Sequence, residues 1–216
     1  FELLFSTIAP HQCLVCKAEG GLLCKTCQIN LPCVPPTCYR CATFALEGVC
    51  GRCSGLSALQ SLCAATTFTG VGQQLVHSLK FERAPAAAIP MAKLICQRSL
   101  PRCAVITNIP TATSRVRTRG YDQSALLAKH ISKIVGVPYA PLLARYGQQR
   151  QLGQNREKRQ QQLEGTFYVI RPQSLQNVVV LLIDDVITTG STLEMAARTL
   201  YAAGAGQVHG GVFAVA

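Results

Sequence analysis

The sequence predicts an α/β fold, in which a central parallel sheet is flanked by helices and preceded by a small cysteine-rich module. The segment Val178 to Ile183 is apolar at every position, which is typical of a strand covered on both faces. Nine of the twelve cysteines lie between Cys13 and Cys53, where large apolar side chains are few. We therefore expect two parts, a cysteine-rich module at residues 10–56 and an α/β domain at residues 60–216.

The chain carries a formal net charge of +11, which suits binding to nucleic acid, to an anionic surface or to a small substrate rich in phosphate. Charge alone does not choose among these classes. The apolar segment at residues 1–9 contains no basic residue and is far shorter than the roughly 20 residues that span a bilayer. We expect no membrane span and a cytoplasmic location.

Four Cys-x-x-Cys pairs organise the first part of the chain: Cys13/Cys16, Cys24/Cys27, Cys38/Cys41 and Cys50/Cys53. The two-residue gap lets both thiolates of a turn reach one zinc ion at about 2.3 Å, and two such turns complete a tetrahedron. Because short links join the first pair to the second and the third to the fourth, we expect two zinc ions with sequential ligands. Interleaved pairing is the alternative grouping, and a disulfide framework is the alternative chemistry.

The expected zinc ions are structural. About forty residues with few large apolar side chains bury too little surface to fold unaided, so metal binding would supply the folding free energy. Cys33 is left over by the four pairs. The remaining cysteines, Cys63, Cys96 and Cys103, have apolar neighbours and are predicted to be inert core residues.

After residue 60 the pattern alternates between strands and helices. Apolar residues recur at helical spacing within Gly70–Phe81, Asp122 can cap the helix that follows it, and Gly204 ends the last helix. The expected strands are Cys63–Phe68, Ala104–Thr107, Tyr139–Arg145, Val178–Ile183 and Gln207–Ala214. The expected helices are Gly70–Phe81, Ala84–Arg98, Gln123–Val135 and Leu193–Ala203.

Polar segments connect these elements. Residues 108–113 are expected to form a loop after the first strand of the parallel sheet, and the basic residues 115–119 continue it. Residues 147–162 are rich in Gln, Arg and Lys, which predicts either a mobile lid or an exposed helix.

The segment from Asp184 to Thr192 predicts a ligand site. Asp184 and Asp185 follow six apolar residues, and carboxylates beside a core are costly unless they meet a ligand, a cation or water at the end of the strand. Hydroxyl side chains then surround Gly190 where a helix begins, and free N–H groups at a helix start stabilise an anion. A phosphate fits this position. The alternative is that the acidic and hydroxyl side chains only cap the helix.

Four or more aliphatic residues, two acids, two small residues and Thr-Thr-Gly-Ser-Thr resemble the phosphoribosyl diphosphate (PRPP) motif of type I phosphoribosyltransferases. The resemblance implies the type I phosphoribosyltransferase fold for the α/β domain. It also implies that Asp184 and Asp185 face the two ribose hydroxyls. The residues that would wrap the 5′-phosphate are Thr188, Thr189, Gly190, Ser191 and Thr192.

Two further segments resemble the ComF family, whose members join an N-terminal double zinc ribbon to a phosphoribosyltransferase-like domain. His77-Ser78-Leu79-Lys80-Phe81 matches the family's His-x-Leu-Lys-Phe/Tyr helix end, and Arg117 to Gln123 resembles Arg-x-Arg-Gly-Phe-Asn-Gln, with Tyr121 for Phe and Asp122 for Asn. Weaker matches fall at Gln151, Arg159, Gly165 and Phe167.

The ComF resemblance implies roles for single residues. Lys80, Pro110 and Thr111 would bind PRPP, the last two at its diphosphate, although Asn108 stands where the family usually has a proline. Arg119 would neutralise the departing diphosphate, and the further candidates for a lid cation are Arg145, Arg150, Arg156 and Arg159. A solvated helix end is the alternative for Lys80, as an ordinary basic loop is for Arg119.

The resemblance implies a PRPP-dependent phosphoribosyltransferase that uses Mg²⁺, acts on an unidentified acceptor and is linked to DNA uptake in natural transformation. The second hypothesis is a non-catalytic protein that senses PRPP or binds single-stranded DNA as an adaptor for competence proteins. Fold alone does not decide between an enzyme and a binding protein. Zinc in the cysteine pairs is expected under both.

Overall fold

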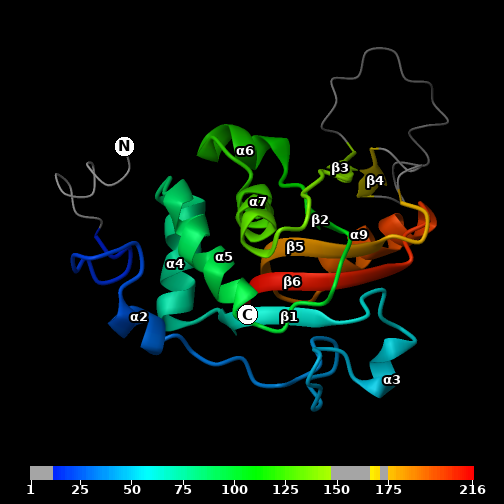
Figure 1. Cartoon of the computed structure of the whole chain (residues 1–216), viewed down its shortest axis with the longest axis horizontal. Helices are drawn as coiled ribbons and strands as arrows, with labels where there is room; N and C mark the ends of the chain where they lie inside the picture. Colours follow the sequence, from blue (N-terminus) through cyan, green and yellow to red (C-terminus); the bar gives the residue numbers. More distant parts are fainter. Residues whose placement is uncertain (1–11, 147–165, 171–174) are drawn as a thin grey trace.

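Figure 1 shows the chain as a computed structural model, which describes residues 12–146, 166–170 and 175–216. Its centre is a four-stranded sheet in the order β1-β6-β5-β2, and each neighbouring pair is parallel. The strands are β1 (Leu62–Thr67), β2 (Val105–Asn108), β5 (Val179–Ile187) and β6 (Gln207–Val215). The predicted fold class, an α/β fold with a parallel sheet, is confirmed.

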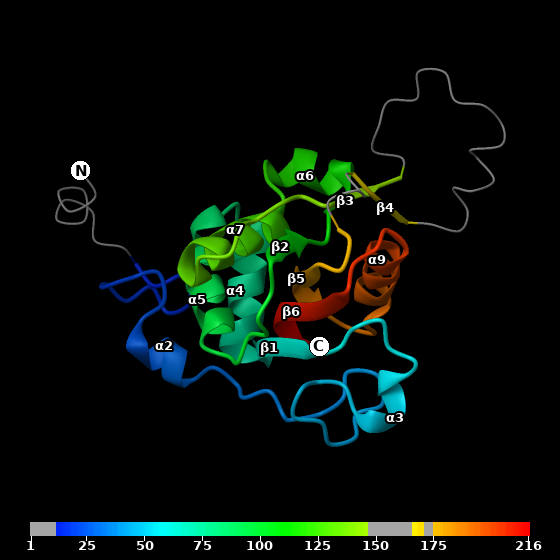
Figure 2. The same ribbon diagram turned by 45° about the vertical axis from the view of Figure 1, so that its right-hand side comes forward.

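Helices cover both faces of the sheet (Figure 2), as the uninterrupted apolar run in β5 requires. One buried cluster, around Leu75, Ile131 and Phe213, packs α4 (Gly70–Phe81), α5 (Ala88–Cys96) and α7 (Gln123–Val135) against one face. A second cluster, around Leu182, packs α9 (Ser191–Ala202) against the other.

The cysteine-rich segment runs along the β1 side of the sheet in Figure 1. It contains two short helices, α2 (Lys25–Ile29) and α3 (Gly51–Ser54). Side chains of its first half, such as Leu14 and Leu31, pack on the cluster under α4, α5 and α7. Tyr39 of its second half packs on the α9 cluster. Each half therefore supports a different face of the domain.

Several predicted elements agree closely with the structure. The helices α4 and α7 have the predicted bounds, and the Asp122 side chain caps α7 by accepting a hydrogen bond from Ala125 N. The predicted helix at residues 84–98 is shorter, because a 3₁₀ turn, η1 (Pro85–Ala87), precedes α5. Two prolines, at positions 85 and 90, occupy the first turns, where their missing N–H groups cost little.

Three predictions need correction. Strand β5 continues through Asp184 and Asp185 to Ile187, because Asp184 pairs in register with Val212 of β6. The basic segment expected as a loop forms α6 (Thr113–Arg119), which ends at Gly120 with φ 88°. The strand expected from residue 139 is limited to β3 (Leu143–Arg145), which pairs antiparallel with β4 (Phe167–Val169), a strand that was not predicted.

The polar segment 147–162 lies outside the described residues, and so do residues 1–9. No helix within the three described ranges has both the length and the apolar character needed to cross a membrane.

Candidate functional site

The predicted phosphate loop joins β5 to α9 and borders a hollow of about 40 Å³, lined by Asp184 and residues 186–193. Gly190 turns the chain at φ 78°, and α9 begins at Ser191 without a side-chain cap. The Thr189 and Ser191 hydroxyl oxygens lie 3.0 Å apart. The loop therefore presents hydroxyl groups at an uncapped helix start, which is an arrangement that can bind an anion.

The two acidic residues lie on one strand but point to opposite faces, because side chains alternate along β5. Asp184 lines the hollow of the loop. Asp185 is buried toward α4, where its Oδ2 lies 3.0 Å from Lys80 Nζ. This contact is an ion pair without hydrogen-bond alignment, since Oδ2 has no hydrogen-bond partner among the described residues. A ligand hydroxyl is the kind of group from which Oδ2 can accept a hydrogen bond.

The surroundings of the acidic pair disfavour the ionised form of Asp184. Burial and the charge of Asp185 raise the pKa of Asp184 well above its usual range, and the hydrogen bond from Asp185 N, 2.8 Å long, only partly offsets this. A cation or hydroxyl donors in the hollow would remove part of the cost of ionising Asp184. Carboxylate oxygens are ligands that Mg²⁺ accepts, so the donor set is compatible with this ion.

The segment predicted to hold diphosphate follows β2 and is braced by Asp122. The N–H and the hydroxyl of Thr111 donate to the two carboxylate oxygens of Asp122 at 2.9 and 3.0 Å. Arg145 Nε donates to Pro110 O at 2.7 Å. Asp122 was predicted only as a helix cap, so its second role as a brace for this loop was missed.

The candidate cations lie at different places. Arg119 Nη1 donates to Gln123 Oε1 at 2.9 Å, and its guanidinium stands 5.6 Å from the Phe81 ring beside the end of α4. Burial lowers the pKa of Arg145, and the nearby carboxylate of Asp184 opposes this shift. Arg145 therefore interacts electrostatically with Asp184, although the two residues are far apart in the sequence. The other family matches and lid candidates lie outside the described residues: Arg150, Gln151, Arg156, Arg159 and Gly165.

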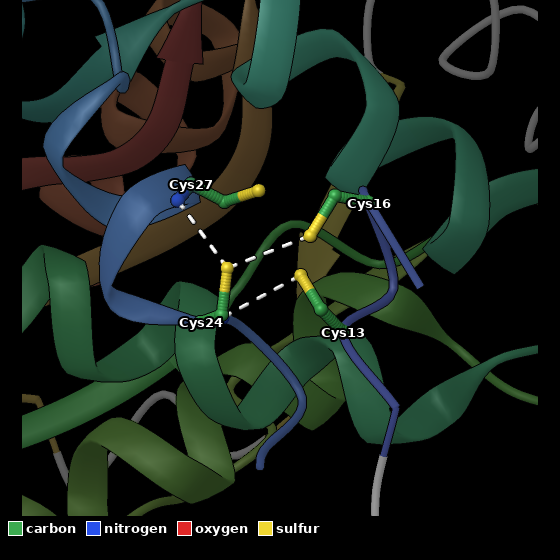
Figure 3. Close-up of side chains that lie close together, drawn as sticks. All are labelled: Cys13, Cys16, Cys24 and Cys27. Atoms are coloured by element: carbon green, nitrogen blue, oxygen red, sulfur yellow. Dashed lines mark hydrogen bonds between the residues drawn. The ribbon is translucent and has the colours of Figure 1, made fainter. Parts of the chain in front are cut away.

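The eight paired cysteines form two clusters of four, in each of which the sulfur atoms lie within 4.8 Å of one another: Cys13, Cys16, Cys24 and Cys27, and Cys38, Cys41, Cys50 and Cys53. This is the sequential grouping. Figure 3 shows the first cluster, whose sulfurs point toward a common centre from two turns. Each cluster offers the four-sulfur donor set of a structural zinc site.

The distances between sulfur atoms fit a metal better than disulfides. Cys16 Sγ lies 3.5 Å from Cys24 Sγ, and Cys41 Sγ lies 3.5 Å from Cys50 Sγ, well beyond the length of a disulfide. Burial disfavours the Cys13 thiolate, but N–H groups of Cys16 and Cys24 outweigh it and lower its pKa to about 6. Burial and the neighbouring thiols raise the pKa of Cys27 in the same cluster to about 12. All twelve cysteines are free thiols, and Cys33 lies outside both clusters.

One buried carboxylate was missed by the sequence analysis. Glu194 lies in the first turn of α9 and accepts hydrogen bonds from the Tyr39 hydroxyl and from Ala58 N, the latter at 2.9 Å. Burial raises its pKa, but these hydrogen bonds and that of Arg40 outweigh it, so the pKa is lowered overall. No sequence pattern indicates this contact, because Tyr39 and Glu194 are 155 residues apart.

The solved structures that the chain resembles include phosphoribosyltransferases. It shares 23% identity with the glutamine PRPP amidotransferase of Bacillus subtilis, over 58% of this chain and 26% of that one, with a TM-score of 0.43. For the adenine phosphoribosyltransferase of Thermoanaerobacter pseudethanolicus, the identity is 15%, the coverage 61% and 68%, and the TM-score 0.40.

No family model matches the chain. It is 28% identical to the DNA utilization protein YhgH of Salmonella typhi over 92% of this chain and 94% of that protein. It is 31% identical to the competence protein ComFC of Bacillus subtilis over 44% of this chain and 38% of that protein. These relatives confirm the resemblance to the ComF family: the chain is a homologue of the DNA utilization protein YhgH and of ComFC.

Proposed function

We propose that the chain binds PRPP at the β5–α9 loop and takes part in DNA utilization through this site. The observation that carries the proposal is the position of Asp184 and Asp185 near the end of β5, from which a short loop leads to an uncapped helix start. A sugar phosphate needs an anion site next to acceptors for its hydroxyls, and this loop offers both. The names of the relatives supply the link to DNA utilization and competence.

Each part of the site has a task in this proposal. Asp184 and Asp185 accept hydrogen bonds from the ribose hydroxyls, and the loop residues Thr188 to Thr192, Gly190 among them, bind the 5′-phosphate. Pro110 and Thr111 lie beside the diphosphate. Lys80, Arg119 and Arg145 place positive charge around it. Mg²⁺ that enters with PRPP would neutralise diphosphate oxygens.

The reaction class that suits this site is phosphoribosyl transfer. An acceptor forms a bond to C1′ while the bond from C1′ to the diphosphate oxygen breaks, and the electron pair leaves with diphosphate. No side chain has to act as a nucleophile, so the protein contributes positioning and charge stabilisation. Release of diphosphate from PRPP in the presence of candidate acceptors distinguishes this enzyme from a protein that only senses PRPP.

PRPP with Mg²⁺ should raise the melting temperature of the protein, and Asp184→Asn should abolish this effect. A ligand at 100 times its Kd stabilises by about 2.7 kcal/mol, which for a chain of this size corresponds to about 5 to 10 °C. Differential scanning fluorimetry with and without PRPP measures the shift. Asp184→Asn keeps the side chain's shape and removes a costly charge, so an absent response does not come from unfolding.

The control for this measurement is Glu47→Gln, which neutralises an exposed carboxylate outside the site and should leave the PRPP response intact. If Asp184→Asn and Asp185→Asn both respond to PRPP as the parent does, the carboxylates are not ribose ligands and the proposal is wrong.

A single-stranded DNA adaptor is the second candidate function. It is favoured by α6, where Arg115 and Arg117 are exposed and no acidic residue is present.

We expect the affinity for single-stranded DNA to fall as the salt concentration rises. The combined change Arg115→Gln and Arg117→Gln should reduce the slope of log affinity against log salt concentration by about 0.7 for each phosphate that these arginines neutralise. Fluorescence titrations at several salt concentrations measure this slope. Lys93→Gln on α5 is the control, and a parent protein without DNA affinity at moderate salt contradicts the adaptor role.

A further inference from the structure

A turn of the second cysteine cluster lies directly behind the phosphate loop. Tyr39 and Arg40 are the two residues between Cys38 and Cys41, and we call these four residues the second knuckle. Both middle residues reach Glu194 in the first turn of α9. The Tyr39 hydroxyl donates to Glu194 Oε1, and Arg40 Nη1 lies 2.5 Å from the same oxygen. The knuckle is therefore fastened to the helix whose start forms the anion site.

Tyr39 also packs against the loop itself. A methyl group added to Gly190 would lie 2.6 Å from Cε2 of the Tyr39 ring, which is too close for any side chain. Gly190 has φ 78°, in the left-handed region that favours glycine. The ring thus fills the space next to the turn that positions the N–H groups of the loop.

Arg40 has an electrostatic task at this junction. Glu194 is buried, with 8% of its surface exposed, and its charge lies in the first turn of α9. An uncompensated carboxylate there would weaken the attraction of the helix start for a phosphate. Arg40 neutralises it at 2.5 Å with a side chain only 32% exposed, whereas the second cation, Arg198, is 3.6 Å away and 65% exposed.

We propose that Tyr39 and Arg40 are positioning residues for the phosphate loop, and that metal binding in the second cluster thereby sets the loop's affinity for the phosphate of PRPP. Neither side chain needs to contact the ligand, because Arg40 acts through Glu194 and Tyr39 acts through Glu194 and Gly190. The inference rests on the proposed function for the identity of the ligand. The contacts that carry it belong to the protein without ligand.

Arg40→Gln should weaken PRPP binding by about 5- to 30-fold, the range expected from an unneutralised charge at a helix start. Arg198→Gln, which removes the exposed cation from the same carboxylate, should change the Kd by less than about 2-fold. Isothermal titration calorimetry with PRPP and Mg²⁺ measures both. In a Glu194→Gln background, Arg40→Gln should have no further effect. Equal reductions in affinity in both backgrounds would overturn the inference.

A second readout needs no ligand and separates this inference from the proposed function. In the apo protein, Arg40→Gln and Tyr39→Phe should speed hydrogen–deuterium exchange in the peptide that covers residues 188–192, and Arg198→Gln should not. If exchange responds in this way but the parent does not bind PRPP, the proposed function fails and the positioning role stands. If exchange in this peptide is unchanged in both variants, the positioning role is wrong.

The link to the metal has a matched pair of variants. Cys41 and Cys16 are both exposed, and each is the second cysteine of the first pair in its cluster. Cys41→Ser should speed exchange at residues 188–192, because the second knuckle loses its metal, whereas Cys16→Ser should leave that peptide as in the parent. If the two changes speed exchange at residues 188–192 equally, the second cluster does not position the loop more than the first cluster does, and the link to its metal is wrong.

Discussion

Protein purified under reducing conditions is expected to contain about two zinc ions per chain, and a strong chelator should unfold its N-terminal part. Around the second cysteine cluster, the separate hydrophobic core consists of Cys38, Ala45 and Cys53, with two partly buried neighbours. So small a core cannot offset the conformational entropy of the segment. Structural zinc supplies about 10 to 16 kcal/mol in comparable zinc-finger peptides, which makes this the largest effect expected here.

Elemental analysis and a thermal melt with and without chelator test this expectation. We expect the melting temperature to fall by more than about 10 °C without metal, because each half of the ribbon also packs on the domain core. Cys33→Ser is the matched control, since Cys33 is exposed and lies outside both clusters, and it should retain two zinc ions. No bound metal would contradict the double ribbon, and one ion would restrict it to a single cluster.

Lys80→Met and Asp184→Asn are expected to change the stability of the apo protein in opposite directions. Lys80→Met leaves the Asp185 carboxylate buried without its charge partner, which typically costs about 3 to 5 kcal/mol. Asp184→Asn removes a carboxylate whose ionisation is opposed by burial and by Asp185, so it should stabilise by about 1 to 3 kcal/mol at neutral pH. Urea unfolding of the three proteins at pH 7 measures both changes.

The pH dependence of the Asp184→Asn effect gives a further check. Because the pKa of Asp184 is raised in the folded state, its contribution to stability is present below the unfolded-state pKa and is lost as pH rises through the folded-state value. The gain in unfolding free energy from Asp184→Asn should therefore be greatest at neutral pH and should disappear toward about pH 4. A stabilisation that does not depend on pH would mean that folding does not change the pKa of Asp184 and would contradict the raised value.

Much of the architecture was predictable, because it depends on local patterns. Three of these patterns are the apolar run in β5, the helical spacing within α4 and the cap of α7. Each involves residues that are close together in the chain, so the sequence alone predicts it. The cysteine pairs are equally local, and the structure groups them in sequential order. The division into residues 10–56 and 60–216 stays a prediction, as do the roles of the PRPP-site residues.

Other features depended on partners distant in the sequence. The pairing of Asp184 with Val212 carries β5 beyond its apolar run, and no local pattern indicates where a sheet partner ends. The α6 helix was missed because its basic residues show no apolar face; none of its residues is buried. Strand β3 is short because its partner β4 contributes only three residues.

The sequence by itself determined the fold class, the two cysteine clusters and the position of a candidate anion loop beside two acids. Only the tertiary structure decided which side chains complete these sites. It places Lys80 against Asp185, and it fastens Tyr39 and Arg40 of the second knuckle to Glu194. Such contacts join residues more than a hundred positions apart. They form because a buried charge is costly unless an opposite charge or a hydrogen-bond donor lies beside it in the folded protein. The spacing of the residues along the chain does not predict which residue that partner is.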